Sequence, residues 1–72
     1  MRFSGNEVAA LHQCALRYAR KLCPDKAGPE LQAAVVDAMH KIYSEVREVG
    51  SVRKVLEKYG CEDLIEEYGI TR

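Results

Sequence analysis

The C-terminal part of the chain carries one short pattern twice, because residues 55–61 read VLEKYGC and residues 64–70 read LIEEYGI. Each copy consists of two apolar residues, two charged residues and then Tyr-Gly-apolar. Glycine just past a helix end adopts a positive φ without a Cβ clash, so following N–H groups can reach the last carbonyls. The apolar residue after it packs back onto the last turn. The pattern therefore predicts two short helices, over about 52–59 and about 62–68, each stopped by a glycine.

A first long helix is predicted near the N-terminus. Ser4 and Glu7 have the spacing of a capping box, in which each side chain bonds the backbone N–H of the other residue. Pro24 disfavours helical geometry at the residue before it. Apolar residues recur at three- and four-residue intervals between these points, as on one face of a helix. The helix is therefore expected over about 5–23.

A second long helix is predicted over about 29–49. Pro29 suits the first helical position, where its missing N–H costs nothing, and Gly50 is a natural stop. The alternation and turn signals of β-strands are missing. We therefore expect a small all-α domain over residues 1–72, in which a long antiparallel helix hairpin is covered by the two short helices.

The apolar face of the helix over 29–49 is too wide for a helix that buries only one side. It covers about 200° of the helical wheel, whereas a surface helix needs about 100°. This helix is therefore either the central helix of the monomer or part of a subunit interface. We interpret the chain as an intracellular protein–protein interaction module that self-associates or binds another protein. The apolar face of the helix over 5–23 is also wide, so the extra apolar surface is assigned to Leu16 on that helix and to Val36, Met39 and Tyr43 on the helix over 29–49.

Nucleic-acid binding is the alternative function. Arg17, Arg20 and Lys21 form a basic face on the first helix, and residues 51–70 have the helix-turn-helix order of a DNA-binding motif. The chain has 11 basic and 11 acidic residues, however, so it lacks the basic excess that is typical of such proteins. The last helix also exposes carboxylates that would repel phosphate. We expect this acidic helix to meet the basic face of the first helix, within one chain or between chains; its carboxylates are Glu62, Asp63, Glu66 and Glu67.

Three cysteines, an odd number, and the lack of a signal-peptide pattern favour a cytoplasmic protein with free thiols. Cys14 and Cys23 share one predicted helix and would lie roughly 13 Å apart along its axis. Disulfides require Cα atoms within about 7 Å, so these two cysteines cannot pair. The spacing leaves a Cys23–Cys61 bridge open.

Metal binding and catalysis find little support in the pattern. Asp37 and His40 are three apart on a predicted helix, but the chain has no C-x-x-C, no H-E-x-x-H and no pair of histidines one turn apart. His12 falls on an apolar arc and is expected to be half-buried, whereas His40 is expected to be solvated. No stretch approaches the ~20 apolar residues of a membrane span. We therefore expect no cofactor, no metal, no membrane insertion and no enzymatic activity.

Overall fold

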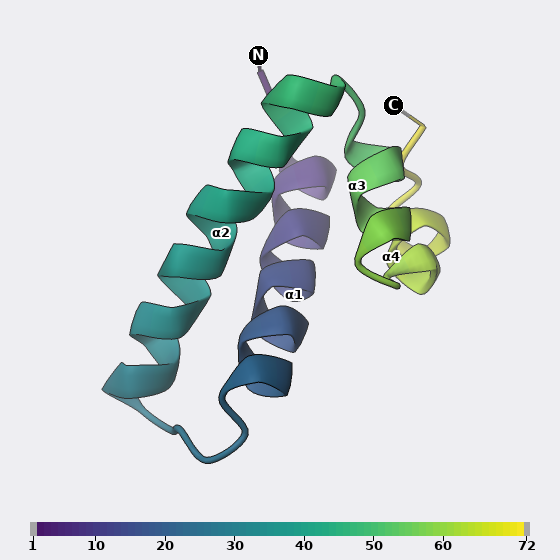
Figure 1. Cartoon of the computed structure of the whole chain (residues 1–72). Coiled ribbons are helices and arrows are strands. Elements are labelled where there is room, and N and C mark those ends of the chain that lie inside the picture. Colours follow the sequence, from purple (N-terminus) through teal and green to yellow (C-terminus); the bar gives the residue numbers. More distant parts are fainter. Residues whose placement is uncertain (1, 72) are drawn as a thin grey trace.

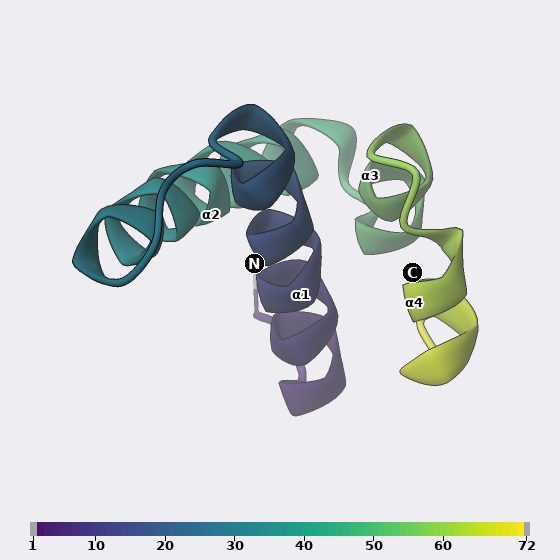
Figure 2. The ribbon, with the colours of Figure 1, turned by 90° about the horizontal axis from the view of Figure 1, so that it is seen from below.

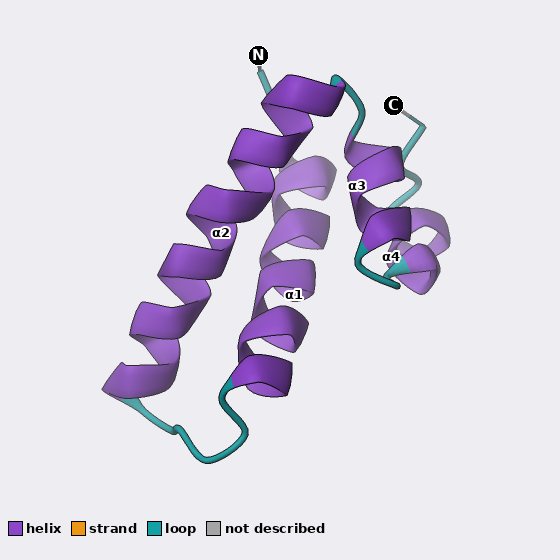
Figure 3. Cartoon of the chain, in the orientation of Figure 1, coloured by secondary structure: helices purple, strands orange, loops and turns teal. Residues whose placement is uncertain are grey.

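The computed structural model describes residues 2–71, which form four α-helices and no strand. The helices are α1 (Gly5–Leu22), α2 (Pro29–Val49), α3 (Val52–Lys58) and α4 (Glu62–Glu67) (Figures 1 and 3). The all-α prediction is confirmed. Every helix begins at the predicted residue and ends at the predicted residue or one before it.

The long helices begin and end where local chemistry predicts. Before α1, Ser4 Oγ accepts a hydrogen bond from Glu7 N–H at 3.2 Å, and Glu7 Oε1 accepts one from Ser4 N–H at 2.9 Å, so the capping box is complete. Pro29 is the first residue of α2. Gly50 ends α2 with φ +77° and donates its N–H to Val46 O at 2.7 Å.

The repeated pattern forms the same C-terminal cap after both short helices. Gly60 adopts φ +73°, its N–H reaches back to the last turn of α3, and Cys61 N–H donates to Leu56 O at 2.8 Å. Gly69, with φ +62°, and Ile70 repeat both bonds after α4. These pairs of bonds define the Schellman motif. The apolar residue after each glycine is buried, so each cap also anchors its helix to the core.

Helices α1 and α2 run antiparallel as a long hairpin, and α3 and α4 pack beside it (Figures 1 and 2). Helix α1 contacts all three other helices, whereas α2 contacts α1 and α3. The central helix is therefore α1. The alternative that α2 is central is wrong, because α3 contacts both long helices whereas α4 contacts α1 and not α2.

The core is mainly aliphatic and is drawn from all four helices. Ala15, Ile42, Val46 and Leu56 have no exposed surface, and Leu64 is 1% exposed. The two short helices have seven and six residues, fewer than an isolated helix needs to be stable in water. Their stability therefore depends on the leucines and valines that they bury against α1.

Candidate functional site

The turn end of the α1–α2 hairpin extends beyond α3 and α4 (Figure 1). Leu22, the last residue of α1, is 62% exposed there, the largest exposure among the big apolar side chains that the structure describes. An aliphatic side chain left in water gives up about 1.5–3 kcal/mol of burial energy. This end of the hairpin is therefore the strongest candidate for a contact surface.

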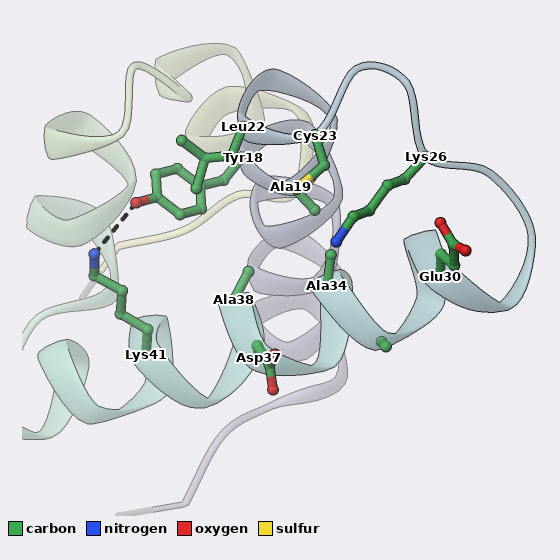
Figure 4. Close-up of a pocket in the computed structure, with 11 residues that line it drawn as sticks. Tyr18, Ala19, Leu22, Cys23, Lys26, Glu30, Ala34, Asp37, Ala38 and Lys41 are labelled. Carbon is green, nitrogen blue, oxygen red and sulfur yellow. Dashed lines mark hydrogen bonds between the residues drawn. The ribbon is translucent and has the colours of Figure 1, made fainter.

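Beside Leu22 lies a hollow of about 380 Å³ between α1 and α2. Figure 4 shows Tyr18, Ala19 and Leu22 on α1 across from Ala34 and Ala38 on α2. The alanines carry only a methyl group, so the two helices leave space that larger side chains would fill. We call these five residues the hairpin-end surface.

Charged side chains of both signs surround the hairpin-end surface. Lys26 reaches over from the turn, and Glu30, Asp37 and Lys41 come from α2 (Figure 4). Lys41 Nζ donates a hydrogen bond to the Tyr18 hydroxyl at 3.2 Å and lies 5.3 Å from the centre of the Tyr18 ring. Two cations and two carboxylates give this rim no net charge.

A second hollow, of about 440 Å³, lies on the other side of Leu22, between α1 and the end of α3. Tyr18 and Leu22 line both hollows, so Leu22 is a ridge between them. Cys14 and Cys61 also line this second hollow. An apolar ridge flanked by two hollows is a shape that another protein surface can complement.

The predicted meeting of the basic and acidic helices is confirmed within one chain. Both terminal nitrogens of Arg17 on α1 donate to Asp63 on α4, at 2.8 and 2.7 Å. The Arg17 guanidinium holds the pKa of Asp63 below its usual value, and the carboxylate raises the pKa of Arg17. Both side chains are exposed, so the pair orients α4 on α1 more than it drives folding. Of the predicted basic contact face, Arg20 and Lys21 are also exposed.

The four residues assigned to the predicted interface are divided between core and surface. Leu16, Met39 and Tyr43 are partly buried and pack against the core of their own chain. Tyr43 stacks on Phe3 with ring centres 5.3 Å apart, and burial raises its pKa. Val36 is 49% exposed. Only Val36 of the four is therefore largely free for a partner, and it is less exposed than Leu22 of the hairpin-end surface.

A polar cluster that sequence reasoning did not find joins α2 to the end of α3. The Glu45 carboxylate accepts a hydrogen bond from Lys58 Nζ at 2.8 Å and a short one from the Tyr59 hydroxyl. The Tyr59 ring meets Tyr18 edge to face at 5.2 Å. The bonds from Lys58 and Tyr59 lower the pKa of Glu45, while burial and the same carboxylate raise the pKa of Tyr59. The sequence indicates that the tyrosine at the end of α3 packs on the core and anchors the helix. It does not indicate which group bonds the tyrosine hydroxyl, because that contact depends on how α2 packs.

The Glu45 cluster predicts a specific loss of stability in acid. A lowered carboxyl pKa stabilises the fold above the unfolded value of 4.5, and this contribution disappears as the pH falls through the folded value. Glu45→Gln should therefore lower the urea midpoint by roughly 0.5–1 M at pH 7. The difference in urea midpoint between the variant and wild type should disappear as the pH falls from about 5 to about 3. Glu48→Gln, which removes an exposed charge from the same helix, should show neither effect. A gap that stays constant with pH would contradict the assignment.

The histidines do not gather with other ligands. His12 is exposed, so the expectation that it is half-buried is wrong, because the arc of α1 that carries it points away from α3 and α4. His40 is exposed, as expected. Within residues 2–71, no three His, Cys, Asp or Glu side chains lie close enough to hold a metal ion. No helix in this range has the length and apolar character that crossing a membrane requires.

No family model matches the chain, and no curated protein or solved structure shows a significant match to it.

Proposed function

We propose that this chain is a protein–protein interaction module that pairs with a second copy of itself through the hairpin-end surface. The observation that carries the proposal is the 62% exposure of Leu22 on a ridge between two hollows. In a symmetric dimer, Leu22 of each copy enters the hollow between α1 and α2 of the other. Burying the part of the two leucines that is still exposed contributes about 2–4 kcal/mol to association.

The charge pattern around the surface favours a second copy as the occupant. Along α2, Glu30 lies near the turn and Lys41 lies three turns further on. A two-fold axis sets the same surfaces against each other in opposite directions. Each Lys41 then faces Glu30 of the other copy, and Ala34, near the axis, allows the two α2 helices to approach closely. The zero net charge of the chain adds no repulsion between copies.

Such a contact needs more area than the hairpin-end surface itself provides. A specific interface buries at least about 1,000 Å² in total, or about 500 Å² on each partner. The described residues expose 4730 Å², so this contact needs roughly a tenth of the surface of each copy. Ala19 and Ala38 are only 2% and 6% exposed, so the contact must extend from Leu22 over the exposed charged side chains around the hollow, which are Lys26, Glu30, Asp37 and Lys41.

Sedimentation velocity at about 1–500 µM tests the proposal. Wild type should become dimeric within this range, and Leu22→Glu should weaken the dimer at least about 100-fold, because it removes apolar burial and adds a charge on both copies. Val49→Glu is the matched control, since Val49 is 51% exposed at the opposite end of α2. A monomeric wild type, or equal effects of the two substitutions, would refute this pairing.

A charge exchange tests the two-fold orientation. Lys41→Glu should weaken the dimer because it sets two carboxylates opposite each other. Adding Glu30→Lys on the same chain should restore the dimer, since the symmetry regenerates both pairs. If the double variant did not dimerise like wild type, the antiparallel arrangement of the two α2 helices would be excluded. The role of Leu22 is tested separately, by the sedimentation experiment. Binding of a different protein, with wild type monomeric, would replace the second copy as the occupant.

A further inference from the structure

Two of the three cysteines lie in contact although 47 positions separate them in the sequence. Cys14 lies in the middle of α1, and Cys61 precedes the first residue of α4. The Cys61 thiol donates a hydrogen bond to the sulfur of Cys14, with the Sγ atoms 3.2 Å apart. Cys14 is fully buried and Cys61 is 2% exposed. Both are free thiols in the structure. Cys61 therefore meets Cys14 and not Cys23, the partner that spacing alone left open.

We propose that Cys14 and Cys61 are a site of reversible oxidation, at which a peroxide converts the two thiols into an intramolecular disulfide. The S–S bond is about 2.0 Å long, so the sulfurs need to approach by only about 1 Å. The S–S bond forms as the two S–H bonds and the O–O bond of hydrogen peroxide break. The sulfurs lose two electrons to the peroxide, and its two oxygens leave with the thiol protons as two molecules of water.

The second hollow lies beside the pair. It holds about 440 Å³, has both cysteines in its lining, and opens between α1 and the end of α3. Cys14 has no exposed surface and Cys61 is 2% exposed, so the oxidant reaches the sulfurs only when the structure opens locally at this hollow. Burial raises the pKa of Cys14, so this residue stays a thiol at neutral pH. Thiolates are the reactive form, so the oxidation of Cys14 by peroxide is expected to be slow at neutral pH and to become faster as the pH rises.

The disulfide would link α1 to the helix that is least stable on its own. Helix α4 has six residues, and an isolated helix of that length is unstable in water. A covalent link from Cys61, just before its first turn, to α1 closes a long loop, which restricts the unfolded chain. It would add to the contact between α1 and α4 that Arg17 and Asp63 already make. Oxidation should therefore add a covalent but reversible link to the docking of α4.

Cys23 serves as a comparison for the pair, and the Cys23→Ala variant is the protein in which the pair is tested. It is partly exposed at the end of α1, and nine helical residues place it roughly 13 Å from Cys14 along the helix axis, too far for a bond. Cys23→Ala removes the only remaining thiol and prevents disulfides between chains, while it keeps the Cys14–Cys61 pair intact. The main measurement therefore keeps both buried cysteines, and only the control variant loses one of them.

The experiment treats the Cys23→Ala protein with hydrogen peroxide in slight excess and then counts thiols after denaturation. We expect both thiols to disappear together, a linked pair of peptides that contain Cys14 and Cys61, and a rise in the unfolding midpoint of about 10–20 °C that dithiothreitol reverses. The same treatment of Cys23→Ala/Cys61→Ala should give no rise. Two thiols that survive, sulfinic acid at either cysteine, or a bond between chains would each overturn the proposal.

Discussion

Leu56→Ala should lower the free energy of unfolding by about 2–5 kcal/mol, because it removes three carbons from a fully buried position and leaves a cavity. A chain of 72 residues has a total stability of about 4–11 kcal/mol at 0.05–0.15 kcal/mol per residue. The substitution therefore removes a large part of the whole. Leu56 lies in α3, which is too short to persist alone, so its loss should release α3 and α4 together.

Thermal unfolding followed by circular dichroism measures this effect, and the midpoint should fall by more than about 10 °C. Leu22→Ala carries the same truncation at a position that is 62% exposed, and in dilute solution it should change stability by no more than about 0.5 kcal/mol. Equal losses in the two variants would mean that α3 is not anchored through Leu56.

The helix boundaries could be predicted because caps are local. The bonds of Ser4 with Glu7, the bond made by Gly50, and those made by the residues after Gly60 and Gly69 span at most five positions, so the sequence alone contains their determinants. The burial of His12 could not be predicted, because an apolar arc shows which side of a helix is apolar but not how far its neighbours extend.

The candidate site depends on the same non-local information. The wide apolar faces of α1 and α2 suggested an interface at Leu16, Val36, Met39 and Tyr43. Most of these side chains pack within the chain instead, as in the stacking of Tyr43 on Phe3. The exposure of Leu22 follows from where α3 and α4 stop along α1. The contact of Cys14 with Cys61 follows from how α4 docks. Spacing in the sequence determines neither.

Replacing both cap glycines should also destabilise the fold strongly. Gly60 and Gly69 adopt φ +73° and +62°, and none of the non-glycine residues in 2–71 has a positive φ. An L-residue in this conformation costs about 1–2 kcal/mol. An added Cβ would meet no atom within 4 Å at either position, so the backbone conformation is the only source of strain. Gly60→Ala/Gly69→Ala should therefore lose about 2–4 kcal/mol in urea unfolding if the two caps act independently.

Two controls separate this backbone effect from the loss of glycine itself. Gly5 lies in the first turn of α1 without a positive φ, and a Cβ there also meets nothing within 4 Å, so Gly5→Ala should stabilise the fold by up to about 1 kcal/mol. A chemically synthesised chain with D-alanine at positions 60 and 69 adds the same atoms but favours positive φ, so it should be at least as stable as wild type. If the D- and L-alanine chains lost equal stability, the caps would not depend on the left-handed conformation, and burial of Cys61 and Ile70 alone would have to hold the ends of α3 and α4.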